Sequence, residues 1–384
     1  GDKDGENNFT DSEGRGGFRF EPPEDFLSLC TANMKDDDYA PIGPNSAAGT
    51  PDKHFDSVLW TGNGVDNTRI GGLNFQPDLV WIKQRNASVQ HNLYDSVRGP
   101  NNQLIPNYSD WEVVRNGVKV FNTDGFTVGN LDDVNDTGDT YVAWNWKANG
   151  SGSANTDGDM AETVTVSANV DAGFSIVKYT GDGAAATIGH GLSKAPEMII
   201  IKLRSAASTW PVYHSGNTAA PETDYLEINS NAATNDTAEN WNDTAPTSSV
   251  FTIGADVEVN TDNENYIAYC WHSVEGYSKV GSYIGNNSTD GTFVYTGFRP
   301  AFVMIKHTTI SAGWVMWDNK RDTTNFITKL LLAESNAAEG SGADVDFLSN
   351  GFKLRDSEAL VNHGSAVFIY LAFAKTPFKY SNAK

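Results

Sequence analysis

Trp60-Thr-Gly-Asn-Gly64, followed by Pro77-Asp-Leu-Val-Trp-Ile-Lys83, is a stretch that this chain repeats twice more. The interval from the leading aromatic residue to the proline is 17 residues in every copy (60 to 77, 179 to 196, 283 to 300). A second aromatic residue follows each proline after the same interval, at 94, 213 and 317. The other two copies read Tyr179-Thr-Gly-Asp-Gly183 with Pro196-Glu-Met-Ile-Ile-Ile-Lys202, and Tyr283-Ile-Gly-Asn-Asn287 with Pro300-Ala-Phe-Val-Met-Ile-Lys306.

The repeated stretch predicts strands joined by tight turns. Gly62 and Gly64 suit a turn that needs positive φ. Pro77 suits the first position of a strand, where a missing N–H costs least. The run Leu79-Val-Trp-Ile82 is apolar at every position, so we expect this strand to be covered on both faces.

A further strand also recurs, as Tyr141-Val-Ala-Trp-Asn-Trp-Lys147, Tyr266-Ile-Ala-Tyr-Cys-Trp-His272 and Phe368-Ile-Tyr-Leu-Ala-Phe-Ala374. Side chains alternate across a strand. One face then carries the bulky residues, and we predict that it is a core face. The bulky residues are Val142, Trp144 and Trp146, Ile267, Tyr269 and Trp271, and Ile369, Leu371 and Phe373.

The sequence therefore predicts an all-β fold with little helix, built from tandem β-sandwich (jelly-roll-like) modules of about 100 residues each. Residues 1–53 read as the C-terminal remnant of an upstream β-domain plus a linker, because the chain starts at Gly1 and runs through a Pro- and Asp-rich segment. Repeat 1 is predicted at 54–150, a linker with one possible strand at 151–173, repeat 2 at 174–278 and repeat 3 at 279–384. The longer junction between repeats 1 and 2 leaves room for a hinge.

Composition and charge narrow the function. The 384 residues include 36 Gly and 10 Trp, and the formal net charge is −22. A surface this acidic repels nucleic acid and anionic membranes, so we expect neither partner. No apolar run of 18 residues is present, so no membrane insertion is predicted. The two cysteines, Cys30 and Cys270, exclude a disulfide framework and a Cys-His zinc site, and Cys270 is expected to be a packing thiol.

One acidic loop is a candidate metal site. Asp132, Asp133, Asp136 and Asp139 imitate the start of a Ca²⁺ loop, although an EF-hand would place a Glu where this chain has Trp144. A solvated hairpin loop is the alternative. We expect no cofactor apart from this possible Ca²⁺.

Two turns at equivalent positions carry an Asp–Arg pair: Asp95 with Arg98, and Asp318 with Arg321. Arg and Asp beside an aromatic residue suit sugar recognition, so these four residues are candidate ligand contacts. Salt links that only stabilise the turn are the alternative. No nucleophile elbow or phosphate loop is visible, and no catalytic set stands out.

The repeated pattern resembles a domain of unknown function that is common in tail-fibre and other virion proteins of marine bacteriophages, notably those that infect cyanobacteria. Residues 54–147 carry every element of it, from Tyr/Trp-Thr-Gly-Asn-Gly to Tyr-Val-Ala-Trp-x-Trp-Lys. Phe26-Leu-Ser-Leu-Cys-Thr-Ala-Asn33 resembles the end of a preceding concanavalin-like or SPRY-like β-sandwich. The resemblance carries over no catalytic residue.

The resemblance implies a non-enzymatic virion structural protein at the virion surface, outside the cell. It would be a tail-fibre or spike component that contacts itself as a homotrimer, other virion proteins, and a host cell-surface glycan or protein. A glycan depolymerase with a carboxylate pair and a bacterial surface adhesin or filament subunit remain the alternatives. Because the repeated strands form a frame, recognition is expected in the segments between them, at 84–92, 101–117, 205–249 and 333–350.

Overall fold

The chain folds as an all-β protein, as its composition and repeated strands predict. The computed structural model describes residues 9–12, 14–24, 26, 28, 41–43 and 46–376. Cys30 and most of the segment 26–33 therefore lie outside the described residues. Within the described part, every α-helix is a single turn of four residues: α1 (Asp132–Asn135), α2 (Ala238–Trp241), α3 (Val257–Asn260) and α4 (Ala359–Asn362). Two 3-10 turns, η3 (Pro51–Lys53) and η4 (Pro221–Thr223), complete the helical content described.

Each repeat contains four antiparallel strands in the same order, which we call its main sheet; they form a complete sheet in repeat 1 and part of an eight-stranded sheet in repeats 2 and 3. The strand order is β1-β9-β3-β4 in repeat 1, β12-β19-β14-β15 in repeat 2 and β20-β27-β22-β23 in repeat 3. The bounds are β1 (Phe55–Thr61), β3 (Leu79–Gln84), β4 (Asn92–Asp95), β9 (Thr140–Trp146), β12 (Phe174–Thr180), β14 (Met198–Leu203), β15 (Pro211–His214), β19 (Asn265–Trp271), β20 (Ser278–Ile284), β22 (Pro300–His307), β23 (Trp314–Asp318) and β27 (Val367–Ala374).

A smaller sheet packs on one face of each main sheet and makes the repeat a sandwich. In repeat 1 the apolar layer between the two sheets contains Val80, Ile82 and Ala143 from the main sheet and Phe126 and Val128 from the smaller one. The smaller sheets are formed by β2 (Thr68–Gly71), β8 (Gly125–Val128) and β7 (Val118–Asn122), and by β13 (Ala186–Gly189) and β18 (Val250–Ile253). In repeat 3 the corresponding layer is formed by β21 (Phe293–Tyr295), β26 (Gly351–Leu354) and β25 (Gly340–Leu348), which are the far end of the same eight-stranded sheet as its main sheet.

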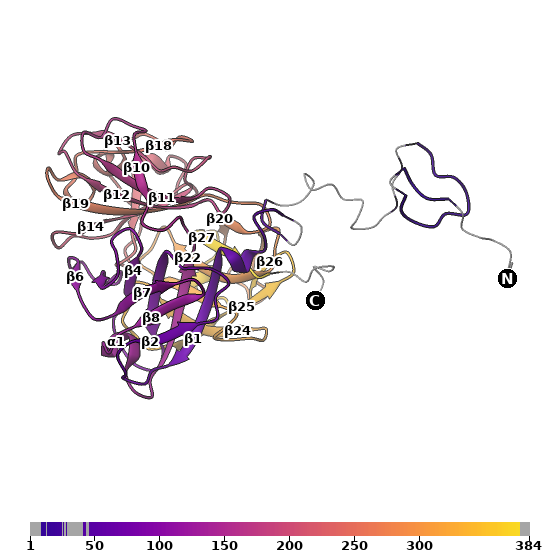
Figure 1. Cartoon of the computed structure of the whole chain (residues 1–384), viewed down its shortest axis with the longest axis horizontal. Helices are drawn as coiled ribbons and strands as arrows, with labels where there is room; N and C mark the ends of the chain where they lie inside the picture. The colour runs from indigo at the N-terminus through magenta and orange to yellow at the C-terminus, as the bar shows by residue number, and fades with distance from the viewer. Residues whose placement is uncertain are drawn as a thin grey trace.

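The other face of every main sheet packs into one central core that all three repeats share. Trp144 of repeat 1, Tyr269 of repeat 2 and Leu371 of repeat 3 occupy equivalent positions and belong to the same buried cluster. The bulky face predicted from the sequence is therefore a core face, and the main sheets are covered on both sides. Figure 1 shows the three repeats as three groups of strands, coloured purple, then magenta into orange, then orange to yellow.

Aromatic rings from the three repeats meet near one end of this shared core. The ring centroid of Trp146 lies 6.2 Å from that of Trp271 and 5.7 Å from that of Phe373, and these three residues lie at or near the ends of the equivalent strands β9, β19 and β27. Burying a large apolar side chain contributes roughly 1.5–3 kcal/mol. The three repeats are thus arranged around the shared core. The junction between repeats 1 and 2 is not a hinge in this arrangement.

The segment expected to be a linker between repeats 1 and 2 adds strands to repeat 2. β10 (Ser153–Asn155) and β11 (Val164–Asn169) extend the main sheet beyond β12. The remaining strands are β5 (Asn102–Gln103), β6 (Val113–Val114), β16 (Asp224–Glu227), β17 (Asn235–Asp236) and β24 (Ile327–Leu332). They lie in the long excursions that follow β4, β15 and β23, and these excursions carry the contacts between repeats.

Candidate functional site

The two Asp–Arg pairs singled out in the sequence are buried. The side chains of Asp95 and Arg98 are 0% exposed, and so are those of Asp318 and Arg321. In each pair the guanidinium Nε donates to the carboxylate. A glycan cannot reach these groups, so the expected ligand contacts of the four residues are corrected: they are internal salt links.

Each buried pair is held by an aromatic residue of the neighbouring repeat. The hydroxyl of Tyr269 in repeat 2 donates to Asp95 Oδ2 of repeat 1 at 2.7 Å. The indole N–H of Trp144 in repeat 1 donates to Asp318 Oδ2 of repeat 3 at 3.0 Å. The turn that was expected to face a ligand therefore faces the next repeat, because both partners project from the shared core.

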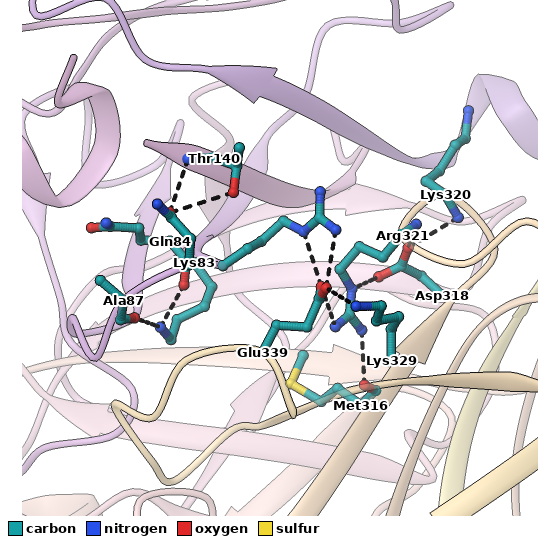
Figure 2. Close-up of polar contacts among 12 residues, drawn as sticks. Lys83, Gln84, Ala87, Thr140, Met316, Asp318, Lys320, Arg321, Lys329 and Glu339 are labelled. Carbon is teal, nitrogen blue, oxygen red and sulfur yellow. Dashed lines mark hydrogen bonds and ion pairs between the residues drawn. The ribbon is translucent and has the colours of Figure 1, made fainter. Parts of the chain in front are cut away.

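A glutamate at each of these interfaces joins two arginines. Glu339 of repeat 3 accepts from Arg85 of repeat 1 at 2.9 and 3.1 Å, and Arg321 of its own repeat lies 3.4 Å away. Figure 2 shows Glu339 between Arg321 and Lys329, with the Asp318–Arg321 pair beside it. Although burial opposes the charged form, the Arg85 hydrogen bonds and the charge of Arg321 hold the pKa of Glu339 below its ordinary value.

Glu112 has the same role one interface earlier. It accepts from Arg204 of repeat 2 at 2.8 and 3.1 Å and from Arg98 of its own repeat at 2.9 Å. The backbone repeats the pattern, because the amide of Glu112 donates to the carbonyl of Arg204 at 2.8 Å and that of Glu339 to the carbonyl of Arg85 at 2.7 Å. The segment that follows the fourth strand of a main sheet therefore packs against the hairpin of the next repeat that corresponds to β3–β4. We call this segment the clasp of its repeat.

The interface between repeats 2 and 3 keeps this geometry without the charges. The amide of Thr234 donates to the carbonyl of Thr308 at 2.8 Å, and its hydroxyl donates to Asn217 at 2.7 Å. His214 takes the place of the aspartate and contacts the carbonyl of Tyr370 at 3.2 Å through Nε2. The four positions that carry an Asp, two Arg and a Glu at the other interfaces carry neutral side chains here. No charge is therefore left unpaired at these positions.

A buried lysine ends the repeated strand in every copy. Lys202 donates to the carbonyls of Ser109 in repeat 1 and Ser208 at 3.1 and 2.7 Å, and Lys306 donates to the carbonyl of Asn231 in repeat 2 at 3.3 Å. Lys83 donates to carbonyls within its own repeat (Figure 2). Burial lowers the pKa of Lys202 to about 7 and those of Lys83 and Lys306 to about 8. Such amines are nucleophilic at neutral pH, but these three are enclosed and tied to backbone oxygens, so their role is structural.

Most of the segments expected to carry recognition therefore hold the repeats together. Contacts between repeats come from 84–92, 101–117 and 205–249, and from the first part of 333–350. The sequence pattern shows that these segments vary between repeats. It does not show that contacting positions change together. Arg85 contacts Glu339 and Arg204 contacts Glu112, whereas the corresponding pair between repeats 2 and 3 is Thr308 with Thr234.

The acidic loop does not form a metal cluster in the described residues. Asp139 accepts from Gln84 at 2.7 Å and from Asn86 at 2.8 Å, and Asp136 accepts from the amide of Thr137. Asp132 and Asp133 begin α1. Across residues 46–376 and the described parts before them, no group of three His, Cys, Asp or Glu side chains is placed to hold a metal ion.

The organising residue of that loop is a neighbouring asparagine that the acidic pattern did not single out. Asn135 is fully buried, donates to the carbonyls of Val65 and Gly129 at 2.9 Å, and accepts from the amide of Asn63 at 3.1 Å. Asn260 and Asn362 repeat these roles in repeats 2 and 3. The signal was present, because an asparagine ends the short helical turn of every copy.

One exposed aromatic surface lies on the clasp of repeat 1. Tyr108 is 43% and Trp111 53% exposed, and exposed Asp110 lies between them. The backbone under them is fixed, because the carbonyl of Tyr108 accepts from the indole of Trp210 at 2.9 Å. Repeats 2 and 3 have Ala233 and Ala338 at the positions that the shared backbone contacts of Glu112, Thr234 and Glu339 make equivalent to Trp111.

One cavity among the described residues has charged side chains in its lining. This cavity of about 180 Å³ lies between repeats 1 and 3 and is lined by Asp52, Asp56 and Lys320, among others. Asp52 accepts from Asn74 at 2.7 Å and Asp56 from Lys320 at 3.1 Å, so both carboxylates are engaged. Burial raises the pKa of Asp56 against the opposing charge of Lys320.

Comparison with known proteins adds one positive finding. A family model described as a domain of unknown function (DUF7483) matches residues 50–377, which include all three repeats. No curated protein matches the chain. Within the described residues, no helix is long and apolar enough to cross a membrane.

Proposed function

The chain belongs to the DUF7483 family of domains of unknown function, and we propose that it is a non-enzymatic component of a bacteriophage virion. It would stand in a tail fibre or spike, outside the cell, as a rigid β body that attaches the particle to a host surface glycan. The phage assignment rests on the resemblance of the repeated motif to virion proteins. The self-association of such appendages, here as a homotrimer, is part of the same proposal.

The observation that carries the attachment role is the exposed pair Tyr108 and Trp111. Their rings lie in solvent while the backbone beneath them is pinned between repeats 1 and 2. Aromatic side chains on a rigid backbone supply a large contact area and lose little conformational entropy on binding. Exposed Asp110 adds an acceptor for sugar hydroxyls. The positions equivalent to Trp111 in the other repeats are alanines, so this aromatic pair occurs in repeat 1 alone.

Two experiments test the proposal. Immunogold labelling of purified virions with antibody against this chain is expected to mark an appendage; absence of label from every part of the particle would overturn the virion assignment. Binding of the fluorescent chain to host cells is expected to fall at least tenfold in a Tyr108→Ala, Trp111→Ala variant. Val120→Ala, which removes an exposed apolar side chain from β7, serves as the control. Equal binding by both variants would show that attachment lies elsewhere.

A further inference from the structure

In repeat 2, a segment of the chain covers the gap between the edge of the main sheet at β12 and the edge of the smaller sheet at β13. We call this gap the seam of the sandwich. β11 pairs with the outer edge of β12, with Ser167 opposite Ile176. Residues just before it pair with β13 of the smaller sheet, where Gly158 bridges Ile188. The amides of Asp159 and Met160 both donate to the carbonyl of Thr187, at 3.1 and 3.2 Å, and the Asp159 carboxylate accepts from the Thr187 amide at 2.5 Å. The segment 153–169 thus supplies a backbone partner to both sheet edges.

The equivalent seam of repeat 3 has no such segment among the described residues. β20 and β21 are the two end strands of its sheet. The connection from β19 to β20 runs only from Trp271 to Ser278 and is folded into a turn, in which the amide of Tyr277 donates to the carbonyl of Val274. It is too short to return across the seam, so it cannot close repeat 3 as the segment 153–169 closes repeat 2.

The free edge of β21 presents backbone groups outward. The carbonyl of Thr292 accepts from the amide of Leu354, and the amide of Thr296 donates to the carbonyl of Asn350. In an antiparallel pair, alternate residues turn their N–H and C=O groups to the partner strand. Thr292, Val294 and Thr296 therefore face β26, and the backbone groups of Phe293 and Tyr295 face away from it, as those of Thr187 do in repeat 2.

Apolar side chains line this free edge in repeat 3 only. Phe293 is 43%, Tyr295 66% and Ile284 53% exposed. The strand registers make these positions equivalent to Thr187, Gly189 and Thr180 in repeat 2, and to Arg69, Gly71 and Thr61 in repeat 1. An uncovered strand edge with large apolar side chains favours the addition of another strand, and natural proteins usually blunt or cover such edges.

We propose that the seam of repeat 3 between β20 and β21 is a docking site for an extended strand of a partner polypeptide. The strand pairs with the backbone of β20, as β11 pairs with β12 in repeat 2, and the residues before it pair with the backbone of β21 beside Phe293 and Tyr295. The chemistry of the occupant follows from repeat 2. There Val164-Thr-Val-Ser167, which alternates β-branched apolar and hydroxyl side chains, pairs with β12, and residues 158–160 pair with β13. The site does not depend on the attachment role proposed for repeat 1.

A synthetic peptide with the sequence of residues 153–169 is a suitable probe, because its own copy already fills repeat 2. Added to the full chain, it is expected to slow hydrogen exchange of the amides of Phe293 and Tyr295 at least tenfold. The variant Phe293→Ser, Tyr295→Ser, which removes the exposed aromatic side chains from β21, is expected to lose the peptide. Arg69→Thr, at the matching position of repeat 1, is the control and is expected to retain it.

A second peptide separates strand pairing from apolar adhesion. N-methylation of alternate residues removes the backbone donors while keeping the side chains. If the methylated peptide binds as well as the original, or if exchange at 293–295 is unchanged by either peptide, the proposal is overturned. Concentration-dependent dimerisation of the chain alone, abolished by the double variant, would identify a second copy as the occupant and would also overturn it.

Discussion

Single residues at the interfaces show why the buried charges occur in sets. Glu339 satisfies Arg85 and Arg321 together, and Glu112 does the same for Arg204 and Arg98. Removing one partner of a buried ion pair leaves an uncompensated charge, whereas replacing the whole set by neutral groups is tolerated. The interface between repeats 2 and 3 shows the second outcome inside the same molecule.

Glu339→Gln is therefore expected to destabilise the chain by about 3 kcal/mol. The glutamine keeps the shape but leaves the guanidinium group of Arg85 without its counter-charge and that of Arg321 with Asp318 alone. Chemical denaturation with a fluorescence readout measures the change in free energy of unfolding. Asp290→Asn, which breaks an ion pair on an 84% exposed carboxylate, is the control and should leave the midpoint unchanged. A midpoint shift of the same size in both variants would contradict the assignment.

At the scale of elements, the turn after the first strand of each repeat is fixed by glycines for two different reasons. Gly64 and Gly183 have positive φ, 67° and 74°, and Asn287 takes the same conformation at 54°. Gly62 does not need positive φ. A Cβ there would lie 2.1 Å from the carbonyl oxygen of Asp136, and the same close approach occurs at Gly181 and Gly285. The glycine lets the turn pack against the end of the short helix.

Gly62→Ala is expected to be strongly destabilising, by about 2–3 kcal/mol, because the added methyl group must displace backbone and not a flexible side chain. Gly71→Ala in the same repeat is the control, since the nearest atom to its Cβ lies 3.9 Å away and its φ is not positive. Thermal unfolding followed by circular dichroism compares the two. Equal melting temperatures for both variants would show that the turn can move away from α1.

Much of the element level could be predicted from the sequence. The period-2 alternation in Tyr141–Lys147 indicates its core face, and the fully apolar Leu79–Ile82 indicates cover on both sides. The alternation of apolar residues shows that a strand face is buried but not which part of the chain covers it. A core shared by the three repeats therefore could not be distinguished from a separate core within each repeat. For the same reason the sequence pattern could not show that Asp95 and Arg98 face Tyr269, which lies 174 residues from Asp95.

At the scale of the whole molecule, the contacts run in a closed cycle. Repeat 1 clasps repeat 2, repeat 2 clasps repeat 3, and repeat 3 clasps repeat 1. This is the head-to-tail arrangement that closes a ring in an oligomer, built here within one chain. The trimerisation proposed for the virion must therefore use other surfaces, because the faces that pair in this way are already occupied.

We expect the three repeats to unfold together. The central core draws on all of them, so the loss of one repeat would expose Trp144 or Tyr269 of its neighbours. Differential scanning calorimetry is expected to give one transition whose calorimetric enthalpy equals the van't Hoff enthalpy. Limited proteolysis is an independent check and should leave residues 50–376 as one resistant unit. Three separate transitions would contradict a shared core.

The closed cycle also has a consequence for synthesis on the ribosome. β27 (Val367–Ala374) lies in the middle of the main sheet of repeat 3, between β20 and β22, and it supplies Ile369, Leu371 and Phe373 to the central core. Until that strand emerges, the inward faces of the first two repeats, with their tryptophans, lack part of the surface against which they pack. The nascent chain must therefore carry an unfinished apolar surface until β27 has been synthesised, and transiently exposed apolar surface of this kind is what chaperones protect.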